Sequence, residues 1–224
     1  MQNRDDRAEF ISAQIARAEQ IALIKGSGVN LEEFTCSPEP APDNGLRCVL
    51  PARLLRDKGV LEFVEAARIL KSQPATQTIH MILVGGIDPH NPSSIAETEL
   101  NEWIQEGIIE WMGHRNDMET VFHECHIAVL PSYREGLPKA LIEAGACGRP
   151  SVTTDVPGCR EIIQDGVNGL LVPPQNATAL ATAIQRLHAD ANMRQRMGRE
   201  SRRIVGEEYS VETVIASTLA LYGA

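Results

Sequence analysis

The sequence lacks any arrangement of cysteines that would cross-link a fold or hold a metal. Five cysteines occur in 224 residues, an odd number, and no two of them form a Cys-x-x-Cys pair. Disulfide-rich secreted domains use even sets of cysteines, and structural zinc sites use closely spaced pairs. We therefore expect reduced thiols and a cytoplasmic protein.

Long apolar runs and an excess of positive charge are also missing. The apolar stretches are much shorter than the ~20 residues that a membrane-spanning helix needs. Residues 1–7 are polar and charged, so we expect no secretory signal there. The formal net charge of −9 argues against non-specific binding to nucleic acid and against a broadly basic membrane-binding face. The apolar content of 43% suffices for the core of one domain.

What the sequence does contain is an alternation of apolar strands and helices. Strands are expected at 21–24, 47–55, 79–86, 108–113, 127–130, 151–154 and 169–174. Helices are expected at 4–19, 59–71, 94–106, 117–124, after Pro138, from 156, and at 176–190, 192–207 and 211–222. Most strands are continuous apolar runs, so both sheet faces should be covered. This pattern predicts an α/β fold, a Rossmann-like doubly wound parallel sheet of about six strands.

Some local signals refine this assignment. Asp57 is expected to cap the helix that begins at Gly59, and Asn176 to cap the helix of residues 176–190. Residues 35–46 are rich in proline and predict a surface loop.

The most informative stretch is residues 133–143, Tyr-Arg-Glu-Gly-Leu-Pro-Lys-Ala-Leu-Ile-Glu. It follows an apolar strand, turns at Gly136 and enters a helix near Pro138. The free N–H groups of a helix start and the helix dipole favour an anion. Glu135 and Glu143 add carboxylates that accept hydrogen bonds from hydroxyl groups. The combination predicts a pocket for a ligand that carries both phosphate and hydroxyls.

Other polar residues and glycines are predicted at the same edge of the sheet. Arg53 and Lys58 bracket a strand-to-helix junction, which in an open α/β sheet lies at the carboxyl edge, where ligands bind. The glycine-rich segments Lys25–Asn30 and Gly85-Gly86 follow other expected strands and allow close approach of a ligand. No Gly-x-Gly-x-x-Gly motif follows an early strand, which disfavours an NAD-binding domain.

In this order and spacing, the motifs resemble the donor-binding domain of a known enzyme family. They are Gly26–Asn30, Arg53 with Lys58-Gly59, Glu135–Pro138 with Glu143, and Val156–Glu161 followed by Asp165–Pro173. Across essentially its whole length, the chain resembles the C-terminal, nucleotide-sugar-binding half of a GT-B-fold retaining glycosyltransferase of family 4, the "group 1" glycosyltransferases.

The resemblance implies a role for each residue that matches the family's motifs. Arg53 and Lys58 would neutralise the leaving nucleoside diphosphate, which would make a metal cofactor unnecessary. Glu135 would contact the donor sugar, and Glu143 the ribose hydroxyls. The substrate-binding set would be completed by backbone groups and one base-side arginine, namely Ser27, Gly28, Gly86, Gly136, Leu137 and Arg115.

The resemblance also implies partners. The donor would be a nucleotide-diphosphate sugar, with UDP the commonest nucleotide, and the acceptor a glycan or a lipid-linked glycan. Residues 1–224 would form a single domain, and an N-terminal acceptor domain would be absent from this chain. The helix within residues 208–224 would brace that domain. The full-length protein would be cytoplasmic, either free or peripheral at the inner face of the membrane.

Alternatives stay open at this point. The two glutamates could be a glycosidase acid/base pair, which requires carboxyls about 5–10 Å apart around one glycosidic bond, although the nearby basic pair favours phosphate. The chain could also belong to another GT-B enzyme, such as a sugar-nucleotide epimerase or a sucrose-synthase-like enzyme, or be a non-catalytic nucleotide-sugar-binding module.

Two clusters invite a different assignment, and the simpler interpretation is preferred for both. His123-Glu124-Cys125-His126 has metal-binding residue types. However, Cys125 and His126 are adjacent at the start of a strand, so their side chains point to opposite faces and are not expected to share a metal. The arginines of the 192–207 helix, Arg194, Arg196, Arg199, Arg202 and Arg203, are expected on a solvated face, with contact to acidic phospholipid as the alternative.

Overall fold

The computed structural model describes residues 1–41 and 45–223, and six strands in these ranges form one parallel sheet. The strands are β1 (Leu46–Pro51), β2 (Ile79–Val84), β3 (Glu110–Trp111), β4 (Ile127–Leu130), β5 (Ser151–Thr154) and β6 (Gly169–Val172). Their spatial order is β3-β2-β1-β4-β5-β6, and every pairing is parallel. The predicted doubly wound α/β sheet is confirmed. Residues 42–44 of the expected proline-rich loop lie outside the described residues.

Both faces of the sheet are buried, as the continuous apolar strands predicted, except at the edge strand β3, whose two residues are exposed. In β1, Cys48 and Leu50 face one core cluster, whereas Val49 between them belongs to the other. In β2, Met81 and Leu83 face the first cluster and Ile82 the second. Alternating side chains of one strand therefore build two cores, one on each face.

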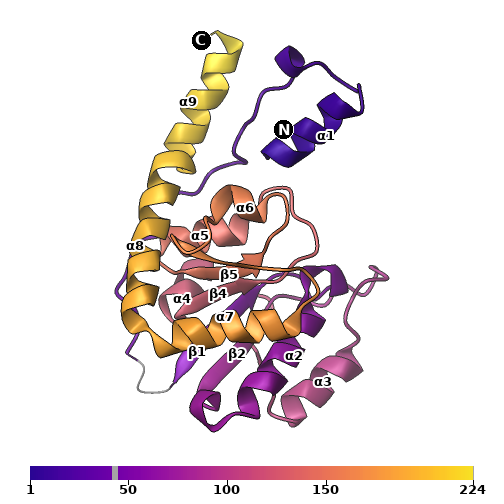
Figure 1. Cartoon of the computed structure of the whole chain (residues 1–224), viewed down its shortest axis with the longest axis vertical. Helices are drawn as coiled ribbons and strands as arrows, with labels where there is room; N and C mark the ends of the chain where they lie inside the picture. Colours follow the sequence, from indigo (N-terminus) through magenta and orange to yellow (C-terminus); the bar gives the residue numbers. More distant parts are fainter. Residues whose placement is uncertain (42–44, 224) are drawn as a thin grey trace.

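The helices divide between these two faces (Figure 1). The first core is covered by α2 (Val60–Lys71), α3 (Glu97–Gln105) and α7 (Ala177–Ala189). The second core is covered by α4 (Met118–His123), α5 (Lys139–Ala146), α6 (Cys159–Ile162) and the C-terminal part of α8 (Ala191–Glu208). Three 3-10 turns are described as well: η1 (Ala18–Gln20), η3 (Arg56–Lys58) and η4 (Pro74–Thr76).

The chain switches direction in the sheet at β1. It runs outward from β1 to β2 and β3, then returns to place β4 on the other side of β1. In open α/β sheets, ligands bind at the carboxyl ends of the strands at such a switch point. The segments after β1 and β4 contain Arg53, Lys58 and Glu135, so the predicted site residues lie at this place.

The two ends of the chain leave the compact body. Helix α1 (Arg4–Ser12) buries none of its residues, and α9 (Val211–Tyr222) buries only Val214. Both lie at the same end of the molecule (Figure 1). Ile215, Leu219 and Leu221 of α9 are about half exposed, at 52%, 48% and 53%. Helix α9 corresponds to the helix predicted within residues 208–224. Glu208 still belongs to α8, and Ala224 lies outside the described residues.

Three local predictions were wrong. Residues 21–24 form no strand, and only Val29 of the following loop pairs, through a single bridge to Ser210. The expected helix at 4–19 ends at Ser12, because Gln14 turns into a left-handed conformation with φ 58°. Asp57 does not cap α2: Gly59 occupies the cap position, and the Asp57 carboxylate accepts a hydrogen bond from Ser93 instead. Asn176, in contrast, caps α7 through Ala179 N–H as predicted.

Candidate donor-binding site

Lys58 and Glu135 form an ion pair across the switch point. Lys58 Nζ lies 2.7 Å from Glu135 Oε1, and their side chains are 21% and 12% exposed. The contact joins the segment after β1 to the segment after β4. It is held in place because Tyr133 N–H donates to the Asp57 carbonyl at 2.9 Å. A partly buried amine beside a carboxylate can stabilise both a phosphate and a sugar hydroxyl.

Arg53, Gly86, Arg115 and Glu143 line one cavity of about 200 Å³. The four residues come from the segments after β1, β2 and β3 and from α5, so residues far apart in sequence meet here. The Arg53 guanidinium is 63% exposed and pairs with Asp88 at 3.0 Å. Arg115 Nε donates to Asp117 at 2.7 Å. Lys58 and Glu135 do not line this cavity, so the predicted residues fall into two neighbouring groups.

Glu143 is the most buried of the predicted carboxylates, at 8% exposure. Burial raises the pKa of this carboxyl above its ordinary value, and the ammonium of Lys139 at 2.9 Å lowers it in part. A desolvated carboxylate gains from accepting hydrogen bonds, which suits contact with a pair of ribose hydroxyls. Lys139 was missed in the sequence, although its i, i+4 spacing to Glu143 was a usable signal.

The glycine turn after β2 brings two strand ends close together. Gly85 has φ 152°, and a Cβ on it would lie 1.9 Å from the Ala52 carbonyl oxygen. Its carbonyl also accepts a hydrogen bond from Trp111 Nε1 at 2.9 Å. Only glycine allows this approach, which leaves Gly86 at the cavity wall.

The predicted glycine-rich segment 26–30 lies on the other side of the Glu135–Pro138 loop. A Cβ on Gly26 would lie 3.0 Å from Leu137, so these two segments are in contact. Gly28 is buried against the backbone of Val211, and a Cβ there would lie 2.8 Å from Val211 Cα. This packing explains why glycine is needed at Gly28 without any ligand. Ser27 is exposed beside it.

The loop of Glu135, Gly136 and Leu137 is also held by the N-terminal segment, which the sequence did not predict. Asn3 is fully buried and donates to the Gly136 carbonyl at 2.8 Å. Gly136 itself is exposed and has no left-handed conformation, so it needs no glycine-specific turn. The loop therefore rests on residues more than 130 positions away in sequence.

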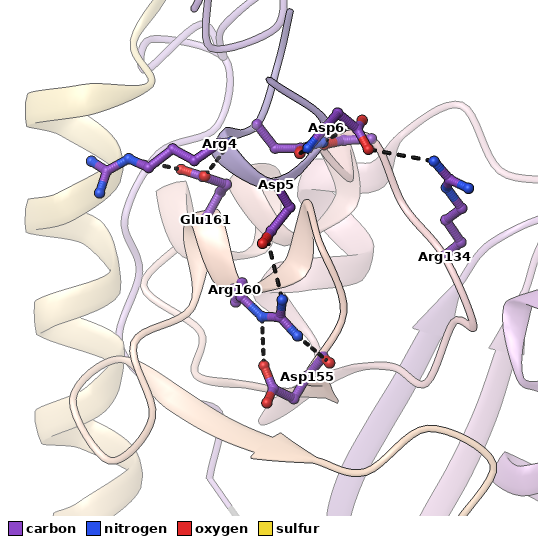
Figure 2. Close-up of polar contacts among 9 residues, drawn as sticks. Arg4, Asp5, Asp6, Arg134, Asp155, Arg160 and Glu161 are labelled. Atoms are coloured by element: carbon purple, nitrogen blue, oxygen red, sulfur yellow. Dashed lines mark hydrogen bonds and ion pairs between the residues drawn. The ribbon is translucent and has the colours of Figure 1, made fainter. Parts of the chain in front are cut away.

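Three ion pairs join the start of α1 to the rest of the domain (Figure 2). They join consecutive residues of α1 to the segments around α5 and α6, as Arg4–Glu161, Asp5–Arg160 and Asp6–Arg134. The distances are 3.8, 3.2 and 3.4 Å. Because α1 has no buried apolar face, these polar contacts fix its position.

The His123–His126 segment, which has metal-binding residue types, makes contacts within the fold. Among the described residues, no group of three or more His, Cys, Asp or Glu side chains could hold a metal ion. Cys125 and His126 are buried, and His123 Nε2 lies 2.7 Å from the Thr35 carbonyl. Burial raises the pKa of Cys125, Cys147 and Cys159 to about 12, so these thiols stay protonated.

The expectation of a solvated arginine face on α8 was wrong in part. Arg194 is buried and pairs with Glu39 at 2.6 Å, and Arg202 donates to the carbonyls of Phe34 and Ala146. Arg196, Arg199 and Arg203 are exposed as expected. No helix in residues 1–41 and 45–223 is both long and apolar enough to cross a membrane.

Comparison with known proteins places these features in context. The family model described as "Glycosyl transferases group 1" matches residues 46–190, which include Arg53, Lys58, Glu135 and Glu143. An N,N'-diacetylbacillosaminyl-diphospho-undecaprenol alpha-1,3-N-acetylgalactosaminyltransferase of Campylobacter jejuni is 33% identical over 201 residues. That alignment covers 85% of this chain and 51% of the relative. The chain thus spans about half the length of this curated relative.

Solved structures share the fold. The crystal structure of Anabaena Alr3699/HepE in complex with UDP superposes with a TM-score of 0.82 at 23% identity. The superposition covers 98% of this chain and 62% of the Anabaena chain. The C-terminal domain of a glycosyl transferase group 1 protein (LpcC) of Francisella tularensis has a TM-score of 0.68 at 22% identity. There, 82% of this chain matches 99% of the solved domain.

Proposed function

Because the chain belongs to the group 1 glycosyl transferase family, we propose that it binds the nucleotide-diphosphate sugar of a retaining hexosyl transfer. The observation that carries this proposal is the meeting of Arg53, Gly86, Arg115 and Glu143 around one cavity at the switch point. A nucleoside would lie there, with Glu143 accepting hydrogen bonds from the ribose hydroxyls and Arg115 beside the base.

The diphosphate would then lie between Arg53 and the Lys58–Glu135 pair. Its charge grows as the bond to the sugar breaks, and fixed cations near it stabilise that change. Arg53 and Lys58 supply these cations, and backbone N–H groups of Gly136 and Leu137 add donors. We propose that these groups make a metal cofactor unnecessary. Glu135 would release Lys58 in part and accept a hydroxyl of the donor sugar.

UDP is the nucleotide that we propose, because a solved neighbour of the same fold was crystallised with it. The acceptor would be a glycan or a lipid-linked glycan, in line with the undecaprenol-linked acceptor in the name of the Campylobacter relative. A lipid-linked acceptor would place the full-length protein in the cytoplasm, at the inner face of the membrane. A sugar-nucleotide epimerase or sucrose-synthase-like activity is the enzymatic alternative, since both would use the same donor site.

An acceptor-binding domain outside these 224 residues would complete the active site. Two observations support it: the chain covers 51% of the Campylobacter relative, and α9 exposes an apolar face at the end of the molecule where α1 lies. Residues 1–224 would be one donor domain, and α9 would brace the acceptor domain. The chain by itself should transfer little sugar to an acceptor, and robust turnover would contradict this division of labour.

Calorimetric titration with UDP tests the proposal directly. Saturable binding is expected, and Glu143→Ala should weaken it by roughly tenfold, because two charge-assisted hydrogen bonds are lost. Arg68→Ala is the control, since Arg68 lies at the far end of α2 and pairs with Glu106. Wild-type affinity in Glu143→Ala, or an equal loss in the control, would show that the site is elsewhere.

A further inference from the structure

We propose that a second cavity, at the opposite end of the sheet, binds a small phosphate monoester. It has a volume of about 500 Å³ and is lined by residues that include Glu39, His126, Arg149, Arg194 and Arg199. His126 precedes β4, and Arg149 lies just before β5. The cavity is therefore at the amino ends of the strands, whereas the donor site is at their carboxyl ends.

The charge of this cavity is opposite to that of the protein. Its wall contains three guanidinium groups and one carboxylate, a formal charge of +2, in a chain whose net charge is −9. Burial lowers the pKa of His126, so this imidazole is neutral near pH 7. A positive concavity in an acidic protein concentrates anions.

Within residues 1–41 and 45–223, two of the three arginines have no carboxylate partner. Arg149 is 2% exposed, and its guanidinium donates to Phe122 O, Ser37 Oγ, Pro38 O and His123 O, all neutral acceptors. Arg199 forms no ion pair within the described residues. Arg194, in contrast, is paired with Glu39. Buried charge is normally compensated, so an anion in this cavity would complete its electrostatics.

His126 contributes a neutral, buried ring to the wall of the cavity. Its Nδ1 accepts the Arg47 N–H at 3.1 Å, so the proton of the neutral ring is on Nε2. Nε2 is buried and has no partner with hydrogen-bond geometry in residues 1–41 and 45–223, so this ring shapes the wall and offers no donor to a ligand.

The size and charge select the class of ligand. A phosphate monoester carries about −1.5 to −2 at pH 7, which matches the excess charge of the wall. Guanidinium groups bind its oxygens in a forked geometry. The cavity is large enough for a phosphate with a short organic group. None of these steps uses the donor site, so the inference does not rest on the proposed function.

NMR titration of the 15N-labelled chain with glycerol 3-phosphate, at constant ionic strength, tests this site. The amide of Gly148, which lines the cavity, should shift saturably in the low millimolar range or below. The amide of Gly86 marks the donor site and should not shift in parallel. No saturable shift at Gly148, or the same response to glycerol alone, would overturn the proposal.

Substitutions of the exposed Arg199 and the half-buried Glu39 test whether the charge of the cavity wall determines ligand affinity. Arg199→Ala should weaken binding about fivefold. Arg196→Ala is the matched control, because Arg196 is exposed on the same helix but does not line the cavity. Glu39→Gln should act in the opposite direction and tighten binding about threefold, since it removes the opposing carboxylate. Equal affinities for the two arginine variants would overturn the assignment.

An experiment with lipid vesicles distinguishes a free phosphate monoester from a lipid head group as the ligand. Sedimentation with phosphatidic acid vesicles should capture no more of the wild type than of Arg199→Ala. If the vesicles bind through Arg199 and glycerol 3-phosphate does not, the ligand is a membrane surface and the proposal of a small molecule is wrong.

Discussion

The two ends of the parallel sheet use the same residue type in opposite ways. At the carboxyl end, Arg53 is 63% exposed and has a single carboxylate partner, Asp88. At the amino end, Arg149 is 2% exposed and makes four hydrogen bonds to neutral groups of two separate segments. An exposed guanidinium can exchange its partner for a ligand at little cost, whereas a buried one is part of the fold.

The largest expected effect comes from removing the buried arginine. Arg149→Met should destabilise the domain by about 3 kcal/mol, because the buried Phe122 carbonyl would lose its side-chain donor and the hydrogen bonds that join the Ser37–Pro38 segment to α4 would be lost. Urea denaturation at pH 7 measures this change. A loss below about 1 kcal/mol would mean that Arg149 does not hold these segments together.

The same substitution at the carboxyl end should leave stability almost unchanged. Arg53→Met should alter the free energy of unfolding by less than about 0.5 kcal/mol, because its ion pair is solvated. UDP affinity should nevertheless fall about tenfold, since one charge beside the diphosphate is lost. Calorimetry and urea denaturation of one preparation give both values. Unaltered UDP binding would remove Arg53 from the site.

A smaller effect, with a pH signature, is expected at Glu143. The pKa of this carboxyl is raised in the folded state, so protonation favours folding, and that contribution is lost as pH rises through the folded-state pKa. Glu143→Gln mimics the protonated form and should raise the Tm at pH 7 by about 2 °C. The gain should vanish below the carboxyl's ordinary pKa. An equal gain at both pH values would exclude ionisation as its cause.

The smallest effect should come from Asp88, the partner that Arg53 leaves when a ligand binds. Asp88→Asn should change stability by less than about 0.5 kcal/mol. It should tighten UDP binding about twofold, because Arg53 is released and a negative charge near the diphosphate is removed. Weaker UDP binding in this variant would mean that Asp88 orients Arg53 for the ligand.

The N-terminal part shows where local signals were insufficient. The apolar residues of 21–24 resemble a strand, yet Leu23 is 38% exposed, and the segment exchanges backbone hydrogen bonds with Met1 and not with a strand of the described sheet. A strand forms only where a neighbour can accept its hydrogen bonds. The helix of residues 4–19 likewise depended on an apolar side that found no core to pack on.

The sequence by itself determined the sheet and the positions of most predicted site residues. Continuous apolar strands specify a sheet covered on both faces, and the polar residues that follow β1 and β4 must then lie at its carboxyl edge. Tertiary structure alone decided the partners: Asp88 for Arg53, Glu135 for Lys58, and Asn3 beneath the Gly136 loop. It also buried Arg194, which was expected on a solvated helix face, and it buried Arg149 between two segments. Such pairings join residues that are tens of positions or more apart, and the spacing of residues in a sequence carries no signal for contacts of that kind.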